Sequence, residues 1–464
     1  MPLTLRYKAK GTQVRFPVKL DLALVILRIA LVAAILPLAI GWRTPLLASW
    51  RTVALAILLA LPLLLIAIEV WTLRRARART LRVAGAASLL LALIAFGTTA
   101  ALELRFQYQR SAVLAANPAE LERLGRHFLI GYRRQSELQA LLDRRAVAGV
   151  FISALNVEGR SRDDVRRRID GLQALRRTQD LPPLWIATDQ EGGPVSRLSP
   201  PLMRQASLAE VVALHRDPAE RLVAVRQYAA HQGRELGSLG VNLNFAPVVD
   251  LNHGVVNPDD RLSRISSRAI SADPAVVTEV AGLYCATLMQ TGVHCTLKHF
   301  PGLGRVYEDT HRVTAELSAS SRELERSDWV PFRHVTAQGD VFMMLSHARL
   351  TEIDRDRPAS FSDAVVKGLL RESWKYDGIL VTDDFSMGAV TFSNEGAAGG
   401  AVAALNAGVD LLLVSYDPDQ YFPMMYALLA AARDGRLRPD MLEASAARLR
   451  RAATPLNSAS LHAK

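Results

Sequence analysis

The sequence predicts an α/β protein: a (β/α)8 barrel of the TIM type, preceded by an N-terminal region of three transmembrane helices. Two observations support this fold class. Long apolar blocks fill residues 20–102 of the 464-residue chain, and short apolar segments alternate with amphipathic helical stretches in the rest. A chain of this length has room for one large domain and an additional segment.

The apolar blocks are each close to membrane-spanning length: residues 20–40, 53–71 and 83–102. About 20 mostly apolar residues suffice to cross a bilayer. Charged residues inside the blocks, such as Arg28 and Glu69, are tolerated near helix ends or between helices. A secretory signal peptide has one short apolar run, so three runs argue against it. We therefore expect residues 1–102 to be a membrane anchor, with three buried helices of a soluble domain as the alternative.

Basic residues are distributed unevenly around the three blocks. They gather in the N-terminal tail and in the loop after the second block: Arg6, Lys8, Lys10, Arg15, Lys19, Arg74, Arg75, Arg77, Arg79 and Arg82. The loop after the first block has only Arg43 and Arg51. The positive-inside rule places the tail and the second loop in the cytoplasm, so the domain after Leu102 is expected on the extracytoplasmic side. Part of the net charge of +11 is this topological signal and predicts no nucleic-acid partner.

The rest of the chain has the alternation of a parallel barrel. Its strand-like segments are residues 127–132, 149–155, 184–190, 241–250, 294–300, 340–347, 378–384 and 409–415. Amphipathic helical stretches lie between most of them, which implies a parallel sheet covered by helices. Eight such units in about 340 residues fit a (β/α)8 barrel. An open doubly wound sheet is the alternative, but no G-x-G-x-x-G follows the first strand. The barrel is expected at 121–455, after a linker at 103–120 and before a flexible tail at 456–464.

The chain has two cysteines, Cys285 in an apolar helical pattern and Cys295 at the start of a predicted strand. Their spacing matches no metal-binding motif. A domain of this size does not need a disulfide framework, so we expect two buried free thiols. A disulfide between them is the alternative.

Polar residues end five consecutive predicted strands: Asp189, Asp250, Lys298, His299, His347, Asp383 and Asp384. The C-terminal strand ends of a barrel meet at one mouth, where active sites lie. Any one of these residues could be a cap or a loop anchor, and His347 could either line the mouth or satisfy a strand-end hydrogen bond. Five consecutive strands that all end in polar residues predict a functional site.

The chemistry of this mouth suits hydrolysis of a polyhydroxylated substrate. It combines carboxylates, histidines and a lysine, with no cysteine ligand and no nucleotide-binding loop. Histidine and aspartate side chains can bind Zn²⁺, but no HExxH-type spacing supports a metal site. We expect no metal and no cofactor.

Six motifs occur in order along the barrel: "ATDQEGG" (187–193), "NFAPVVD" (244–250), "ISSRAIS" (265–271), "KHFPGLG" (298–304), "DTH" (309–311) and "VTDDFSM" (381–387). Together they resemble glycoside hydrolase family 3, in its single-domain β-N-acetylglucosaminidase, or β-hexosaminidase, branch. The resemblance covers about residues 120 to 455. It implies retaining hydrolysis of terminal β-linked N-acetylglucosamine, often from peptidoglycan fragments.

The resemblance also implies catalytic roles. Asp383 matches the nucleophile, which holds the glycosyl group covalently in a retaining mechanism. Asp384 is expected to be structural. His311 matches the acid/base of this branch, and an imidazole can donate and then accept a proton near neutral pH. Asp309 can hold the other ring nitrogen of His311 and fix its tautomer.

Sugar-binding positions follow from the same resemblance: Asp189, Arg197, Arg268, Lys298 and His299. The chain departs from the common pattern at two places. Pro194 takes the place of the first arginine of "EGGRV", and Leu303 stands where a histidine is common. Both departures leave the catalytic pair in place.

The leading hypothesis is a membrane-tethered exo-β-N-acetylglucosaminidase outside the cytoplasm, with carbohydrate and membrane as its partners. A β-glucosidase-like relative is the alternative among enzymes, but that branch normally lacks the "DTH" loop. A non-catalytic, tethered sugar-binding module is the alternative among binding proteins. Such a module has no need of both a nucleophile and an acid/base.

Overall fold

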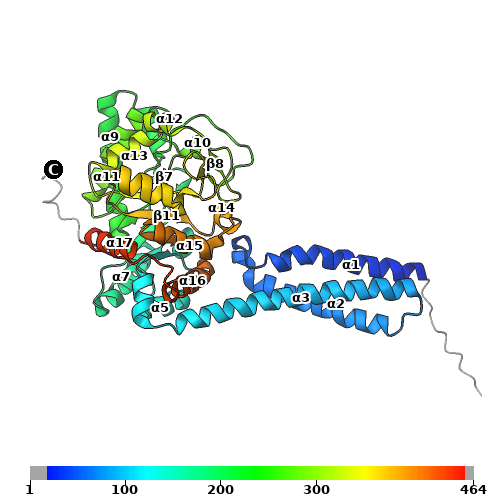
Figure 1. Ribbon diagram of the computed structural model, residues 1–464. Coiled ribbons are helices and arrows are strands. Elements are labelled where there is room, and N and C mark those ends of the chain that lie inside the picture. Colours follow the sequence, from blue (N-terminus) through cyan, green and yellow to red (C-terminus); the bar gives the residue numbers. More distant parts are fainter. Residues whose placement is uncertain (1–17, 455–464) are drawn as a thin grey trace, which may run out of the picture. The chain divides into compact units, whose positions relative to one another are not determined.

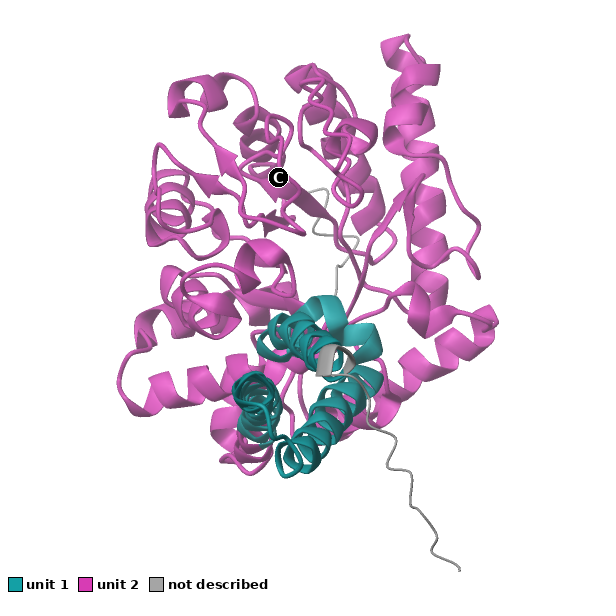
Figure 2. Ribbon diagram, turned by 90° about the vertical axis from the view of Figure 1, so that its right-hand side faces the viewer, with its two compact units in different colours: residues 1–107 teal, residues 108–464 magenta. Residues whose placement is uncertain are grey.

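The computed structural model describes residues 18–454, and the chain forms two compact units, residues 1–107 and residues 108–464 (Figure 2). The basic residues up to Arg15 and the predicted tail at 456–464 lie outside the described residues. The first unit holds most of the long apolar helices, and the second holds the barrel.

The first unit is built from long apolar helices, drawn in blue in Figure 1: α1 (Val18–Ile40), the short 3₁₀ helix η1 (Pro45–Trp50), α2 (Arg51–Leu73) and α3 (Arg79–Leu114). Each predicted apolar block falls within one long helix. Among the described residues, these three helices are long and apolar enough to cross a membrane. They share a buried cluster that includes Val32, Ile35, Leu58, Leu65, Ala92 and Ala95. Other large apolar side chains, such as Leu27 and Leu64, are exposed on the outside.

The charged residues inside these helices pair with one another. Arg28 Nε of α1 lies 2.7 Å from Glu69 Oε1 of α2, and the Glu69 side chain is fully buried. The Thr72 hydroxyl donates to the same carboxylate at 3.2 Å. Arg43 and Glu103 form a second ion pair. An unpaired charge is costly in an apolar environment, so these pairs explain how apolar helices accommodate them.

The second unit contains an eight-stranded parallel sheet. Its strands are β1 (Phe128–Ile130), β2 (Gly149–Phe151), β3 (Trp185–Thr188), β6 (Leu243–Asn244), β7 (Thr296–Phe300), β9 (Phe342–Leu345), β11 (Leu380–Asp384) and β12 (Leu411–Val414). Each predicted strand segment contains one of them. The order in the sheet is β6-β3-β2-β1-β12-β11-β9-β7, which follows the chain order except that β6 and β7 stand at the two edges.

The sheet closes almost completely between β6 and β7. Parallel bridges pair Leu243 with His294 and Val248 with Lys298 across this gap. The Val249 N–H donates to the Lys298 carbonyl at 2.8 Å, and the Thr296 N–H donates to Ala246 at 2.8 Å. The predicted barrel of the TIM type is therefore confirmed.

Helices surround this barrel, as Figure 1 shows. The longer ones are α4 (Pro118–Gly125), α5 (Gln135–Asp143), α7 (Arg162–Thr178), α9 (Pro218–Leu239), α11 (Pro274–Met289), α13 (Trp329–Thr336), the π-helix η3 (Ala364–Ser373), α15 (Gly396–Ala407), α16 (Tyr421–Arg433) and α17 (Pro439–Ala452). Shorter elements lie in the loops: α6 (Ala154–Val157), α8 (Leu208–Leu214), α10 (Ile265–Arg268), α12 (Ser321–Arg326), α14 (Gly388–Thr391), η2 (Ala359–Phe361) and η4 (Pro418–Gln420). Two small sheets pair β4 (Gln190–Gly192) with β5 (Val195–Ser196), and β8 (Glu316–Leu317) with β10 (Arg349–Leu350).

Local sequence sets the helix ends. Helix α9 begins after Asp217, whose carboxylate accepts hydrogen bonds from the N–H groups of Ala219 and Glu220, and Pro218 takes the first helical position. The helix ends at Gly240, which has the left-handed φ of 87° that favours glycine.

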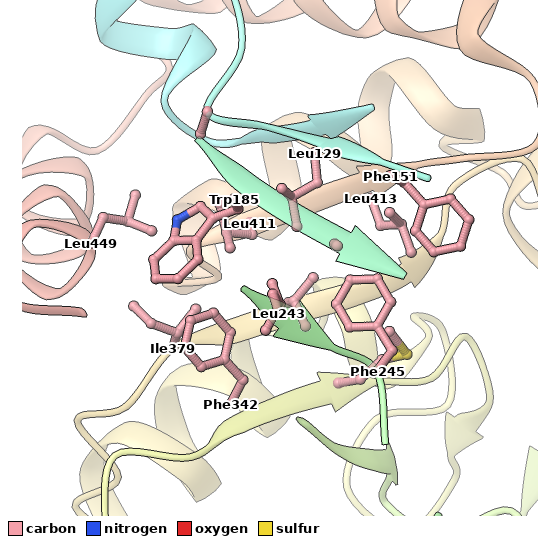
Figure 3. Packing of buried hydrophobic residues seen from close by; sticks show 14 residues of the cluster. Leu129, Phe151, Trp185, Leu243, Phe245, Phe342, Ile379, Leu411, Leu413 and Leu449 are labelled. Carbon is pink, nitrogen blue, oxygen red and sulfur yellow. The ribbon is translucent and has the colours of Figure 1, made fainter. Parts of the chain in front are cut away.

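Large apolar side chains fill the barrel interior, as the close view in Figure 3 shows. Near the N-terminal strand ends, the rings of Trp185 and Phe342 meet edge to face at 5.2 Å, and Leu449 of α17 belongs to the same cluster. Near the C-terminal ends, Phe151 and Phe245 stack 5.9 Å apart. This apolar packing fills the inside of the barrel, so the charged side chains of the mouth gather at the C-terminal strand ends.

Cys285 and Cys295 form a disulfide, and the expectation of two free thiols was wrong. Cys285 lies on α11, and Cys295 directly precedes β7. Between them the chain turns back at Gly292, which has a φ of 83°, so the end of the helix runs beside the start of the strand. The two Cα atoms are thereby 5.4 Å apart, within the range of disulfides. Spacing along the chain gave no indication of this reversal.

The segment predicted as a linker, 103–120, is mostly helical. Helix α3 continues to Leu114, and α4 begins at Pro118 after the capping residue Asn117. The last turns of α3 pack on α16. The Tyr108 and Tyr426 rings lie 6.0 Å apart, and the Arg110 guanidinium lies over the Phe422 ring.

Candidate active site

Most of the predicted site residues gather at the C-terminal ends of the strands. Asp189 directly follows β3, Lys298 and His299 lie within β7, and Asp383 is the next-to-last residue of β11. Arg268 ends the short helix α10, which lies in the long loop after β6. Parallel strands bring these distant residues to one mouth of the barrel.

A buried network of opposite charges joins Asp189, Lys298 and Arg268 through a fourth side chain, Glu191. Lys298 Nζ lies 2.7 Å from Asp189 Oδ1 and 2.5 Å from Glu191 Oε1. The Arg268 guanidinium holds Glu191 with two bonds, Nη2 to Oε1 at 2.6 Å and Nε to Oε2 at 2.9 Å. The Lys298 side chain is only 2% exposed. Bidentate pairing of this kind fixes both partners in orientation.

Glu191 is the central anion of this network, and its role was missed from the sequence although it lies in "ATDQEGG". Burial raises the pKa of the Glu191 carboxyl, but the charges of Arg268 and Lys298 outweigh burial and hold the pKa well below its usual range. Burial likewise lowers the pKa of Arg268, and Glu191 reverses this and raises it. The groups therefore stay charged together. Asp189 is more exposed than Glu191, so it faces the mouth.

His299 is oriented by the carboxylate of Asp250. The Nδ1 atom of His299 lies 2.7 Å from Asp250 Oδ2, and the backbone N–H of His299 donates to the same carboxylate. The Leu303 N–H also donates to Asp250 Oδ1 at 2.7 Å. Because Nδ1 faces the carboxylate, Nε2 faces the mouth, where it lies 3.4 Å from Arg268 Nη2.

The two carboxylates of "DD" have different surroundings. Asp384 is buried and accepts hydrogen bonds from the N–H groups of Ser386, Ser415 and Tyr416 and from the Ser415 hydroxyl. Asp383 is half-buried and, within residues 18–454, accepts one bond, from the Asp384 N–H at 2.8 Å. Asp384 therefore holds the loop after β12 against the end of β11, and Asp383 retains free acceptor sites.

Asp383 is held in its ionised form by nearby histidines. Burial raises the pKa of the Asp383 carboxyl, but His299, His347 and His311 together lower it below its usual range. His347 is fully buried, and both of its ring nitrogens lie near oxygens: Nδ1 is 2.7 Å from Ser360 Oγ, and Nε2 is 3.1 Å from the Asp384 carbonyl. His347 therefore satisfies strand-end hydrogen bonds and does not line the mouth.

His311 and Asp309 form a pair on the loop after β7. His311 Nδ1 lies 2.9 Å from Asp309 Oδ1, and the His311 backbone N–H donates to the same oxygen at 3.0 Å. Burial raises the pKa of Asp309, but the hydrogen bond and charge of His311 outweigh it and lower the pKa to about 2. Asp309 is almost fully buried, whereas 37% of the His311 side chain is exposed. The imidazole thus reaches toward solvent from a buried, ionised carboxylate.

The loop that carries this pair is fixed at both ends. Near its start, the indole N–H of Trp329 donates to the Pro301 carbonyl at 3.1 Å. At its end, the Gly388 N–H donates to the His311 carbonyl at 2.8 Å. A side chain at position 388 would clash, since a Cβ there would lie 2.3 Å from the Arg312 carbonyl oxygen. The His311 segment is therefore docked on the residues that directly follow β11.

Arg197 does not join the charged network. Its side chain is exposed beyond β5, and within the described part of the chain only its backbone reaches the site, through an N–H bond to the Asp189 carbonyl at 3.1 Å. The departure at Leu303 also has a structural explanation. Leu303 is buried in a small apolar cluster with Ile265 and Ala315, where an imidazole would be poorly solvated.

No group of three or more histidine, cysteine or acidic side chains that could hold a metal ion occurs between residues 18 and 454. The charged groups of the mouth instead pair with one another. The arrangement therefore offers an ionised carboxylate, an imidazole backed by a second carboxylate, and a set of donors and acceptors suited to hydroxyl groups.

Comparisons with known proteins agree on one family. The profile described as "Glycosyl hydrolase family 3 N terminal domain" matches residues 116–452. A β-hexosaminidase of Stenotrophomonas maltophilia is 34% identical over 276 residues, which are 59% of this chain and 78% of that protein. A β-hexosaminidase of Pseudomonas aeruginosa is 33% identical over 290 residues, 61% of this chain and 79% of the relative.

Solved structures show the same likeness. A family 3 β-N-acetylglucosaminidase from Paenibacillus superposes with a TM-score of 0.64 at 30% identity, covering 72% of this chain. This chain spans 62% of the length of that enzyme. A β-N-acetylhexosaminidase from Beutenbergia cavernae superposes with a TM-score of 0.62 at 30% identity, covering 72% of this chain and 97% of the other.

The different surroundings of Asp383 and Asp384 generate a prediction about stability. Asp384→Ala leaves several buried N–H groups without an acceptor, so we expect the free energy of unfolding to fall by about 2 to 3 kcal/mol. Asp383→Ala is the matched control, and it should leave stability close to wild type because it removes a single acceptor. Urea denaturation of both variants measures this. Equal stability of the two variants would contradict the structural role of Asp384.

Proposed function

This chain belongs to glycosyl hydrolase family 3, and on that premise we propose that it is a retaining exo-β-N-acetylglucosaminidase tethered to the membrane. Family membership makes it a glycoside hydrolase that acts on O-glycosyl bonds, and its relatives are named β-hexosaminidases. The observation that carries the finer proposal is the Asp309–His311 pair beside the ionised carboxylate of Asp383.

In the first proposed step, the Asp383 carboxylate attacks the anomeric carbon of the sugar. The carbon–oxygen bond to the leaving group breaks, and His311 Nε2 donates its proton to the departing oxygen. The product is a glycosyl ester on Asp383. This division of roles is supported by the charge states, because the three histidines keep Asp383 ionised and therefore nucleophilic.

In the second proposed step, water attacks the same carbon from the face that the leaving group vacated. His311, now neutral, takes a proton from the water, and the bond to Asp383 breaks to restore the carboxylate. Two inversions retain the configuration of the sugar. Throughout, Asp309 accepts the Nδ1–H of His311 and stabilises the imidazolium, because its low pKa keeps it ionised.

We propose that the charged network binds the terminal sugar. Asp189 can accept hydrogen bonds from hydroxyl groups, since its carboxylate is the most exposed of the network. Lys298 and Arg268 can donate to hydroxyl or acetamido oxygens, and His299 presents Nε2 to the same space. Glu191 holds the Arg268 and Lys298 side chains in place when no substrate is bound. Arg197 is exposed and lies outside the network, and we propose that its side chain turns toward the sugar when the sugar binds.

The N-terminal helices are proposed to span the membrane, with the barrel on the extracytoplasmic side. The arginine-rich loop between α2 and α3 supports this orientation by the positive-inside rule. The Cys285–Cys295 disulfide is independent support, because disulfides persist in oxidising compartments and are rare in the cytosol. On that side of a bacterial membrane, peptidoglycan-derived fragments are the proposed source of β-linked N-acetylglucosamine.

The substrate class is tested with two chromogenic substrates. We expect hydrolysis of 4-nitrophenyl β-N-acetylglucosaminide and little hydrolysis of the matching β-glucoside. Asp383→Ala should abolish turnover while the protein stays folded by circular dichroism. A preference for the β-glucoside would favour a β-glucosidase-like enzyme. Sugar binding without turnover by the wild-type protein would favour a binding module, and activity of Asp383→Ala would refute the nucleophile.

A second test concerns His311, through the acidity of the leaving group. A poor leaving group needs protonation, and an activated aryl group does not. His311→Ala should therefore reduce kcat/KM by about 100-fold or more on an unactivated disaccharide, and far less on a dinitrophenyl glycoside. His334→Ala is the control, because His334 is an exposed histidine whose side chain, in the described part of the chain, bonds only within helix α13. Equal losses on both substrates would assign the acid/base role to another group.

Orientation is tested in spheroplasts of cells that express the full chain. A protease that cannot cross the membrane should digest the barrel domain after Leu102. In denatured protein, where buried thiols are accessible, an alkylating reagent should modify Cys285 and Cys295 only after reduction, as measured by mass spectrometry. Protection of the domain until the membrane is broken, together with free thiols, would place it in the cytoplasm.

A further inference from the structure

We propose that Ser263 is a positioning residue for the acid/base: its hydroxyl aligns the Asp309–His311 pair, and its carbonyl links that pair to the sugar-binding Arg268. Ser263 lies just before α10, in the long loop after β6, and no motif identified it from the sequence. The inference rests on the proposed function, in which His311 transfers the proton.

The Ser263 hydroxyl contacts both members of the pair. Its Oγ lies 2.9 Å from Asp309 Oδ1 and 3.1 Å from His311 Nδ1. These two atoms are themselves 2.9 Å apart, so the three polar atoms form a closed triangle. Ser263 is only 5% exposed, so its hydroxyl is buried against the pair.

The proton positions in the triangle follow from the charge of Asp309. An ionised carboxylate can only accept, so the Ser263 hydroxyl donates its hydrogen to Asp309 Oδ1. The lone pairs of the serine oxygen then face the N–H on His311 Nδ1, which is shared between the two oxygens. A hydrogen held on Nδ1 in this way leaves Nε2 as the nitrogen that gives and takes the proton of the reaction.

Asp309 depends on the serine because its bonds are one-sided. Its Oδ1 accepts from Ser263, from His311 Nδ1 and from the His311 backbone. Its other oxygen, Oδ2, is buried with no hydrogen-bond partner among the described residues. Without the serine, the Asp309 carboxylate can rotate away from its present orientation. The His311 imidazole would then lose its fixed direction.

The position of Ser263 is itself set by the sugar-binding network. Arg268 Nη1 donates to the Ser263 carbonyl at 2.7 Å, while the other nitrogens of Arg268 hold Glu191. Asp260 fixes the segment from the other side, since its Oδ1 accepts from the Ser263 N–H at 2.8 Å. A chain of direct contacts therefore runs from the proposed sugar-binding residues to the back of the acid/base.

The structure also offers a conservative replacement. Ser263 lines a cavity of about 290 Å³ between its own loop and residues 303–308. The additional methyl group of a threonine can enter it, so Ser263→Thr keeps the hydroxyl without crowding the site.

The experiment compares Ser263→Ala, Ser263→Thr and the control Ser267→Ala on good and poor leaving groups. Ser267 lies in the same segment and is exposed, and among the described residues its hydroxyl bonds only the Arg264 carbonyl. Loss of one hydrogen bond to a charged group predicts that Ser263→Ala reduces kcat about 10-fold on an unactivated disaccharide, with unchanged KM. The loss on a dinitrophenyl glycoside should be small. Ser263→Thr should restore most of the rate, and Ser267→Ala should match wild type.

A double variant separates positioning from a general structural role. In the His311→Ala background, Ser263→Ala should cause no further loss, because the serine acts through the histidine. A full 10-fold loss in that background, equal losses on both leaving groups, or failure of threonine to restore the rate would each overturn the inference. Wild-type turnover of the N-acetylglucosaminide is measured first. Its absence would reject the proposed function, whereas turnover with a fully active Ser263→Ala would reject only the role of the serine.

Discussion

Strands β6 and β7 meet through a few backbone hydrogen bonds, and the arrangement of the mouth depends on this junction. The bridge between Val248 and Lys298 places Asp250 directly beside His299. The same contact brings Lys298 toward the carboxylates that follow β3. If the sheet stayed open at this point, the cations of β7 and the anions of its neighbours would face solvent separately. Closure of the barrel is thus what assembles a charged site from residues more than a hundred positions apart.

Within that frame, charge balance decides which groups can do chemistry. Glu191 lies between two cations and is fully occupied, so it stabilises the network and does not react. Asp384 is equally occupied by backbone donors. Asp383 accepts a single hydrogen bond from the described residues, and neighbouring histidines lower the pKa of its carboxyl. The proposed nucleophile is therefore the carboxylate with the fewest hydrogen-bond and ion-pair partners. Burial and partners alone distinguish it from Glu191 and Asp384.

Sequence reasoning found those features that follow from local pattern. Each of the eight strands lies within its predicted segment, because buried parallel strands are continuous apolar runs whose ends carry polar residues. Features created by contact between distant segments were not predictable in this way. The disulfide depends on a chain reversal, and Ser263 acquires its role only because the loop after β6 lies against the loop after β7. Glu191 was visible in a quoted motif, but nothing local indicated that Arg268 and Lys298 would both reach it. Arg197 shows the converse, since its place near a motif did not bring its side chain into the network.

The hydrogen bond from Gly388 to the His311 carbonyl has a consequence for how such a barrel can vary in length. It ties the segment of the proposed acid/base to the few residues that follow Asp383. An insertion or deletion between Asp383 and Gly388 would change the separation of the two reacting groups directly. Length changes in the connections on either side of β9, which run through α12 and α13 before this strand and through η3 after it, would leave that separation intact. Loop grafting aimed at new substrates therefore has freedom in these connections and almost none between Asp383 and Gly388.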